Sequence, residues 1–408
     1  MEAETPSMRI LLTSPPGIGH VLPLVPLAWA AELAGHDALL ASTGPALAMA
    51  IHSGLRCAEV CGTDIADTFR RSADHVQFPR PLTRDEVQLV LAGWSKYAEP
   101  RRAPTLSAAE RLLSGTVELT AAVGERMIDG LVGLVHRWSP DVVVATSQMP
   151  AGVLAAEITR VPLVLHRAGV GGPMPAAALA SMSSARARYG LPDGEVAPTA
   201  VVDSCPDSLR PTGSDAGVPL RWTSHTGGGM LPSWALTTPA RPRVCVTAGA
   251  SLAAPAADLL FGELVGRLGR RDVEVVLSTS GADLSSWSPL PSNVRVANWI
   301  PLPAVLPSCL ALVHHGSTSS TFTALAGGVP QLVLPRSLEQ PVNAASVAAR
   351  GVGVACPLLP DAVDEVTAAL DRVLDDDALR ATAREVAEEI AALPAPSHVL
   401  NRLSEFVP

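Results

Sequence analysis

Basic residues are scarce in this chain of 408 residues: its 30 lysines and arginines, of which Lys96 is the only lysine, stand against 39 acidic residues. The net charge of −9 argues against nucleic acid as the main partner, because binding to a phosphate backbone needs a basic surface. A small anionic ligand is compatible with this charge, since backbone N–H groups and single His or Arg side chains bind phosphate locally.

Long apolar runs, a leader sequence and paired cysteines are also lacking. No apolar run reaches the roughly 20 residues of a membrane helix, and the acidic start MEAETPSM has no basic segment of the signal-peptide kind. The six cysteines are scattered, and the one close pair, Cys57 and Cys61, has no second pair to complete a zinc site. We therefore expect a soluble, cytoplasmic protein without a membrane partner.

Apolar residues make up 48% of the chain and charged residues 17%, as in a globular protein. A predicted strand at 8–14, a helix at 21–33 and a strand at 37–41 form a βαβ unit, which indicates a parallel sheet. The same alternation restarts at 243–247, after a Pro- and Gly-rich stretch. The predicted fold class is α/β, with two tandem Rossmann-like, doubly wound domains that face a cleft.

The predicted boundaries follow these changes in composition. They divide the chain into an N-terminal domain, a linker, a C-terminal domain and a last helix that crosses back to the first domain: 1–215, 216–242, 243–390 and 391–408. Between 60 and 105, aromatic residues stand among Pro and Arg without a clean period. We interpret that region as long loops and short helices over the sheet, which are often functional.

The segment between the first predicted strand and helix, Ser14–Pro23, contains Gly17, Gly19 and His20. An imidazole at the carboxyl edge of a parallel sheet can serve as a general base, and glycines let the backbone approach a ligand closely. A dinucleotide fingerprint needs a third glycine where Leu22 stands, so we do not expect nicotinamide binding. Helix capping or ordinary packing is the alternative role for His20.

A second strand-to-helix junction contains His314–Thr321. Free N–H groups at a helix N-terminus bind phosphate, and small hydroxyl-bearing residues leave room for two phosphates. His314 can add a hydrogen-bond donor or a positive charge. The neighbouring His315 does not indicate a metal site, because adjacent strand residues point to opposite faces and no acidic or Cys partner lies near in sequence.

Two further segments carry polar or aromatic groups. Glu339 and Gln340 follow a predicted strand, where a carboxylate beside an amide suits hydrogen bonds to vicinal hydroxyls; a solvated loop is the alternative. Trp299 can stack on a planar base while the backbone at Ile300 pairs with the edge of that base. A core position for Trp299 is equally compatible with the sequence.

These four segments, in this order and at these distances, resemble the GT-B-fold glycosyltransferases that attach deoxysugars to microbial natural products, such as the spinosyn rhamnosyltransferase. The resemblance extends from Met8 to about Leu403 and includes 163–170, 203–209 and 328–335. It implies inverting transfer, without a metal or other cofactor, of a deoxysugar from a TDP-sugar donor to a hydrophobic, polyketide-type aglycone. The N-terminal domain would bind this acceptor and the C-terminal domain the donor.

The resemblance also implies roles for single residues. His20 matches the base that deprotonates the acceptor, His314 matches a contact to the donor diphosphate, and the pair at 339 and 340 matches a group that binds sugar hydroxyls. The donor-binding positions are Trp299, Ile300, His314, Gly316, Ser317, Ser319, Ser320, Glu339 and Gln340. The acceptor-binding positions are Phe78, Trp94, His166 and Met174.

One departure from the family pattern concerns the base. Many relatives have an Asp that orients the catalytic histidine, at a position where this chain has Thr146 or Ser147. Without a carboxylate the pKa of His20 would be raised less. Asp129 and Glu118 are the candidates to replace it, and an auxiliary activator protein, which some relatives require, would be another form of compensation.

Another departure lies in the phosphate loop, where Ser317 and Ser319 replace glycines. The sequence therefore leaves two other functions open: a degenerate homologue that acts as a partner protein, and a nucleotide-sugar epimerase on the same fold. The linker segment 221–229 lies either near the donor or in a flexible hinge. A homodimer is also compatible with the sequence.

Overall fold

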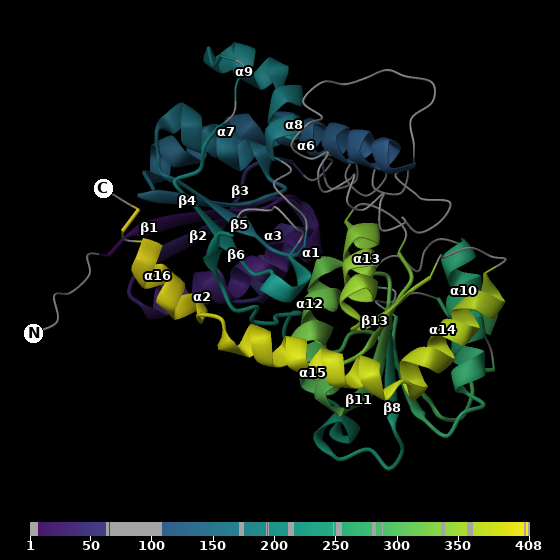
Figure 1. The fold of residues 1–408 in the computed structure, drawn as a ribbon. Coiled ribbons are helices and arrows are strands. Elements are labelled where there is room, and N and C mark those ends of the chain that lie inside the picture. Colours follow the sequence, from purple (N-terminus) through teal and green to yellow (C-terminus); the bar gives the residue numbers. More distant parts are fainter. Residues whose placement is uncertain are drawn as a thin grey trace, which may run out of the picture.

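The computed structural model describes residues 7–62, 65, 108–170, 175–192, 194, 196–210, 216–247, 249, 255–279, 283–287, 289–335, 339–356, 362–403 and 405–406. Two parallel sheets, each flanked by helices, form two halves that lie side by side (Figure 1). The loops and short helices predicted for 60–105 lie almost wholly outside the described residues.

Both sheets are built from short, buried, apolar strands. The first has the order β3-β2-β1-β4-β5-β6-β7 and contains β1 (Arg9–Thr13), β2 (Asp37–Ser42), β3 (Cys57–Glu59), β4 (Val142–Thr146), β5 (Leu163–Arg167), β6 (Ala200–Asp203) and β7 (Val218–Pro219). The second has the order β10-β9-β8-β11-β12-β13 and contains β8 (Arg243–Thr247), β9 (Glu274–Ser278), β10 (Val294–Ala297), β11 (Cys309–His314), β12 (Gln331–Val333) and β13 (Gly353–Ala355).

Helices connect the strands. In the first half they are α1 (Ile18–Val21), α2 (Val25–Leu33), α3 (Gly44–His52), α6 (Ala108–Trp138), α7 (Pro150–Thr159), α8 (Pro175–Ser181) and α9 (Ser183–Tyr189). In the second half they are α10 (Pro255–Leu268), α11 (Leu302–Val305), α12 (Thr318–Ala326), α13 (Gln340–Arg350), α14 (Val363–Asp375), α15 (Asp377–Ala392) and α16 (Pro396–Leu403). No helix in the described part of the chain is long and apolar enough to cross a membrane.

The strand order confirms the predicted fold class. In each sheet the first strand of the half lies in the middle and pairs with the second strand on one side and the fourth on the other, so β1 lies between β2 and β4 and β8 lies between β9 and β11. This is the doubly wound order, and its ligands bind outside the carboxyl ends of the strands, where the order reverses. The loops after β1 and β11 leave the sheets at this point.

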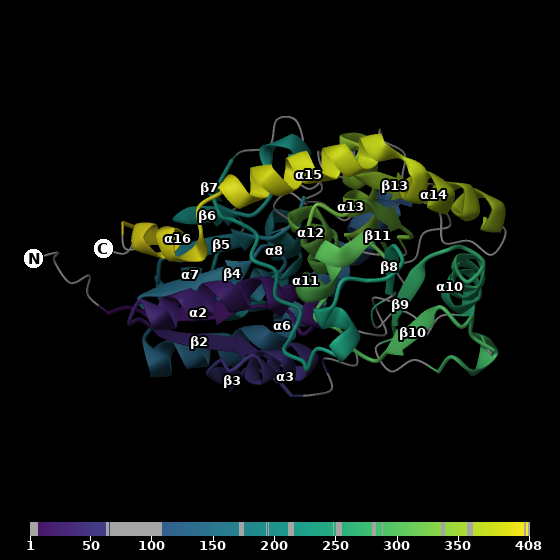
Figure 2. The ribbon, with the colours of Figure 1, turned by 90° about the horizontal axis from the view of Figure 1, so that it is seen from below.

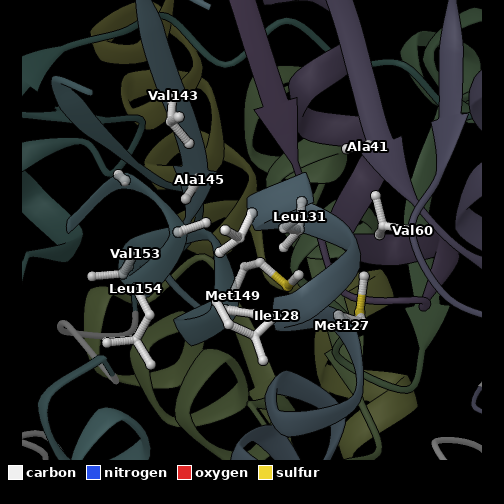
Figure 3. Packing of buried hydrophobic residues seen from close by; sticks show 14 of the residues in the cluster. Ala41, Val60, Met127, Ile128, Leu131, Val143, Ala145, Met149, Val153 and Leu154 are labelled. Carbon is white, nitrogen blue, oxygen red and sulfur yellow. The ribbon is translucent and has the colours of Figure 1, made fainter. Parts of the chain in front are cut away.

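The two faces of the first sheet pack against different helices. Val143 and Ala145 point toward α6 and α7, where they meet Ile128 and Leu131 (Figure 3). Because successive strand residues alternate between faces, Val144 points the other way and packs in one cluster with α1 and α2. The position of a residue in its strand therefore determines which helices it meets.

An apolar cluster joins the two halves. Trp222 of the linker segment packs against Phe322 of α12, with ring centroids 5.1 Å apart. Beside it, Ser208 donates a backbone hydrogen bond of 3.0 Å to the carboxylate of Glu389 on α15. These contacts hold the two halves in one arrangement on this side of the molecule.

The end of the chain returns to the first half. After α15 runs along the second half, α16 packs against α2, as Figures 1 and 2 both show. Val399, Leu400 and Leu403 of α16 are buried in the same cluster as α2. The last helix therefore covers part of the first sheet although it follows the second in sequence.

The first helical segment differs from the single helix predicted at 21–33. The structure has α1, a 3-10 turn η1 (Leu22–Leu24) and then α2, so helical structure begins three residues earlier and is broken. Pro23 and Pro26 explain the break, because a proline has no N–H to donate and is tolerated only in the first turn of a helix. As a result, His20 lies in its own short helix at the edge of the sheet.

Candidate functional site

His20 is positioned by the loop that follows β1. Its backbone N–H donates to the carbonyl of Gly17 at 3.1 Å, and the loop itself is fixed by Ser42, whose hydroxyl donates to the carbonyl of Ser14 at 2.9 Å. The side chain is half-buried. Burial lowers the pKa of His20 to about 4, so the imidazole is neutral near pH 7, as a general base must be.

Two carboxylates, Asp129 and Glu118, were predicted as candidates to orient His20. Asp129 and Glu118 both lie on α6, which covers the face of the sheet opposite α1 and α2. There the Asp129 carboxylate accepts a hydrogen bond of 2.8 Å from the Tyr189 hydroxyl, while Glu118 is exposed. Asp129 is therefore engaged away from His20, which the sequence could not show because it did not reveal which face α6 covers, while the same role for Glu118 stays a prediction.

The N-terminus of α12 is rigidly built. Gly316 has a φ of +89°, and a Cβ at this position would lie 2.8 Å from Cγ1 of Val333, so only glycine fits. Ser317 caps the helix, since its hydroxyl accepts a hydrogen bond of 3.4 Å from the N–H of Ser320. Asn343 donates to the carbonyl of Gly316 at 2.9 Å, which ties the loop to α13.

His314 supports this loop from the core. Its Nε2 lies 2.9 Å from Oε1 of Gln331, and its Nδ1 accepts a hydrogen bond of 3.1 Å from the N–H of Gly316, so Nε2 carries the proton. Burial, with a smaller effect of His315, lowers the pKa of His314 to about 3. We expected a contact to the donor diphosphate, but both ring nitrogens have protein partners, so the ring holds the backbone of the phosphate loop instead.

The two loops meet across the halves of the molecule. The hydroxyl of Ser319 donates to the carbonyl of Gly19 at 3.3 Å, which brings α1 next to α12 (Figure 1). Nearby, a Cβ on Gly169 would lie 2.8 Å from Cγ2 of Thr318, so the chain after β5 also passes close to α12. His20 is therefore one residue away from a direct contact with the helix N-terminus that the sequence predicts to hold phosphate.

Glu339 and Gln340 flank the same helix end. Burial raises the pKa of Glu339, while backbone hydrogen bonds from its own amide and from Thr318 lower it. The carboxylate consequently lies against the first residue of α12, and Gln340 begins α13 as a buried residue. The expected pair for sugar hydroxyls is thus adjacent to the expected phosphate site.

Trp299 lies just beyond β10, and 42% of its surface is exposed, whereas Ile300 is buried in the core of the second half. A Cβ on Gly227 of the linker segment would lie 3.4 Å from Nε1 of Trp299 and 3.3 Å from Sδ of Met49 on α3. The linker segment therefore passes between the two halves beside Trp299. The exposed indole face is compatible with stacking on a base, which stays a prediction.

Of the four expected acceptor residues, His166 is described and Phe78, Trp94 and Met174 lie outside the described residues. His166 is at the carboxyl end of β5 and is buried, which lowers the pKa of its imidazole to about 4. In the part of the chain that the structure covers, no three His, Cys, Asp or Glu side chains come together as a metal site.

The sequence analysis gave no role of their own to two residues beside the N-terminus of α12. Gln331 accepts from His314, and Asn343 holds the loop, yet neither was singled out by itself. The signal for Gln331 was available: it is a polar residue that opens an apolar, fully buried strand. A buried amide of this kind needs a hydrogen-bond partner, and His314 on the neighbouring strand provides it.

Comparisons with known proteins agree with this geometry. Residues 29–249 match the N-terminal domain, and residues 262–406 the C-terminal domain, of the erythromycin biosynthesis protein CIII-like family. The L-demethylnoviosyl transferase of Streptomyces niveus is 37% identical over 406 residues, covering 97% of this chain and 98% of that protein.

Solved structures are similar along the whole chain. The spinosyn rhamnosyltransferase SpnG has a TM-score of 0.81 and 25% identity, covering 98% of this chain and 100% of that one. The glycosyltransferase SsfS6 of Streptomyces sp. SF2575, solved with thymidine diphosphate, has a TM-score of 0.76 and 28% identity, covering 98% and 99%. The chain therefore belongs to the erythromycin biosynthesis protein CIII-like family and is a natural-product glycosyltransferase with the GT-B fold.

Proposed function

We propose that this glycosyltransferase moves a deoxysugar from a TDP-sugar to a hydroxyl group of a hydrophobic, polyketide-type aglycone, with inversion at the anomeric carbon and without a metal. The observation that carries the proposal is the hydrogen bond between Ser319 and Gly19, which joins the phosphate-binding end of α12 to the helix that carries His20. A base and an anion site on opposite halves, in contact at one point, suit a displacement between two substrates.

The donor half would stabilise the leaving group. The first N–H groups of α12 and the dipole of this nine-residue helix favour the negative charge that develops on the diphosphate. Gly316, held by His314 and Asn343, lets the backbone approach the phosphates without a side chain in the way. Glu339 and Gln340, next to this seat, would hydrogen-bond the sugar, and Trp299 would stack on thymine.

The acceptor half would supply the nucleophile. In a single displacement, the acceptor oxygen forms a bond to the anomeric carbon while the bond from that carbon to the diphosphate oxygen breaks, and neutral His20 takes the hydroxyl proton. The electron pair of the broken bond leaves with TDP. Because the oxygen attacks from the side opposite the leaving group, the anomeric configuration inverts.

Three complexes of two related proteins support the choice of substrates. SpnG has been solved with thymidine diphosphate and with the spinosyn aglycone, and both complexes are similar to this chain over 97% of its length. SsfS6 has likewise been solved with thymidine diphosphate. The proposal extends these ligand classes, a thymidine diphosphate donor and a hydrophobic aglycone, to the present chain.

The test is a transfer assay with TDP-rhamnose and a panel of polyketide aglycones, in buffer with EDTA. We expect release of TDP together with a glycoside whose anomeric configuration, determined by NMR, is opposite to that of the donor. Consumption of the TDP-sugar without any acceptor would instead indicate an epimerase. Activity that EDTA abolishes and a divalent cation restores would contradict the metal-independent mechanism.

A further inference from the structure

Two buried polar side chains at the edge of the first sheet have no hydrogen-bond partner among the residues that the structure describes. Thr146 ends β4 and His166 lies near the end of β5, and they are direct neighbours in the register of the two strands. Thr146 is 6% exposed and His166 is 1% exposed. Neither the hydroxyl of Thr146 nor either ring nitrogen of His166 has a hydrogen-bond partner among the described residues.

Both side chains lie on the face of the first sheet that packs against α1, the helix that contains His20. Val144 and Val164, two residues before them in their strands, pack in one cluster with Val21 of α1. Alternation along a strand puts Thr146 and His166 on this same face, one step closer to the carboxyl edge. This is the edge from which the chain enters α1, so the pair lies on the side of the sheet where His20 is held.

Unpaired groups of this kind are unfavourable. A buried donor or acceptor without a partner costs about 1–3 kcal/mol, and native proteins keep few of them. Burial lowers the pKa of His166 to about 4, so near pH 7 the ring is neutral and offers one N–H donor and one acceptor nitrogen. The nearby carboxylate of Asp203, which forms ion pairs with Arg167 and Arg210, raises the pKa of His166, but burial has the larger effect.

A second buried threonine hydroxyl shows why the pair is different. Thr13, at the end of β1, also has no hydrogen-bond partner in the described part of the chain. Thr13 points to the opposite face, because a Cβ added to Gly152 of α7 would lie 2.5 Å from its Cγ2. It has no imidazole beside it in the register of its strand, where Ala41 and Ala145 are the neighbours.

We propose that Thr146 and His166 form a polar subsite for a second oxygen atom of the acceptor, a hydroxyl or carbonyl next to the hydroxyl that is glycosylated. This inference rests on the proposed function, because it assumes that the acceptor binds beside His20. A neutral imidazole and a hydroxyl can each donate to or accept from such an oxygen. The subsite would select aglycones with adjacent oxygens and fix the reacting hydroxyl in front of His20.

The experiment compares two planar, tricyclic probes. Alizarin carries two adjacent hydroxyls, and its monohydroxy analogue lacks the one next to the ring carbonyl. Their dissociation constants are measured by calorimetry in the presence of saturating TDP, for the wild type and for His166→Phe, Thr146→Val and Thr13→Val. Thr13→Val is the matched control, since it removes a buried hydroxyl from the other face of the same sheet.

We expect the wild type to bind alizarin about tenfold more tightly than the analogue, which corresponds to about 1.4 kcal/mol. His166→Phe should abolish this preference and Thr146→Val should reduce it, while both bind the analogue normally and Thr13→Val keeps the full preference. If His166→Phe fails to fold, Thr146→Val alone decides.

A preference that survives in both variants, or no preference in the wild type, would overturn the subsite and leave these groups as ligands of an ordered water. TDP affinity is measured in a separate titration of each protein without a probe. If the wild-type protein does not bind TDP, the result counts against the proposed function. If it binds TDP but shows no preference between the two probes, the result counts only against the subsite.

Discussion

The two halves of this enzyme, to which we assign the acceptor and the donor, are prepared to different degrees. At the N-terminus of α12, His314, Ser317 and Asn343 are hydrogen-bonded inside the protein, and they hold the loop at Gly316 in one conformation. At the matching edge of the first sheet, Thr146 and His166 are buried without such partners in the described residues.

Under the proposed function, this difference corresponds to how the two ligands are recognised. A nucleoside diphosphate has an invariant charged group, so a rigid seat of backbone N–H groups can be built for it in advance. An aglycone has few polar atoms, and each must complete hydrogen bonds that the protein leaves open. A preorganised site and an incomplete site can be distinguished by variants that affect one without the other.

The largest expected effect is on the acceptor side. Replacing the base by His20→Gln should reduce turnover on the order of 100-fold or more, because a proton acceptor is lost from the reacting oxygen. TDP affinity, measured by calorimetry, should stay unchanged. His52→Gln, on the exposed end of α3, is the control and should keep full turnover. Normal turnover in His20→Gln would exclude this residue as the base.

On the donor side, Gly316→Ala should weaken TDP binding about 10- to 100-fold. The added Cβ meets Val333 at 2.8 Å, and the φ of +89° is strained for alanine by about 1–3 kcal/mol. Gly351→Ala is the matched control: its φ is +75°, but no atom lies within 4 Å of the added Cβ, and it follows α13. The Gly351→Ala variant should be less stable than the wild type but should bind TDP with the same affinity. Equal TDP affinity in both variants would show that the Gly316 loop does not bind the diphosphate.

A smaller effect is expected behind the donor loop. Gln331→Leu leaves the Nε2–H of His314 buried without its acceptor, which should lower the free energy of unfolding by about 1–3 kcal/mol and weaken TDP binding severalfold. The double variant with His314→Phe removes both partners and should be less destabilised than the sum of the single changes. Additive losses in denaturant unfolding would contradict a direct interaction between these side chains.

The smallest effect is on the pH dependence of stability. The pKa of His314 is about 3 in the folded protein and 6.5 as its ordinary value, so below pH 6.5 the unfolded chain binds more protons. The stabilisation is complete above pH 6.5 and is lost as the pH falls, at up to about 1.4 kcal/mol per pH unit. His314→Gln should flatten this slope, whereas the exposed His398→Gln should not. An unchanged slope in His314→Gln would contradict the burial of a neutral ring.

Much of the fold could be predicted from the sequence because its central strands are apolar and its connections are short. The alternation of strands and helices was predicted to restart at 243–247, and these are the bounds of β8. Short edge strands such as β3 and β13 could not be predicted, since three residues carry too little periodicity.

The candidate site was predictable in its positions and less so in its interactions. Motif and order placed His20 and the Gly316 loop at the carboxyl edges of the two sheets, where they are found. The partner of His314, the face covered by α6 and the pairing of Thr146 with His166 depend on register between distant strands. A single sequence carries no direct signal for that register.

We propose that the second half contains a preformed site for thymidine diphosphate. The most direct test is calorimetric titration of the wild-type protein with TDP, UDP and NAD in the absence of any acceptor. We expect TDP to bind with a much lower dissociation constant than UDP or NAD. If none of the three binds, the serine-substituted loop at 316–320 has lost its ligand, and the preorganised donor site proposed here is contradicted.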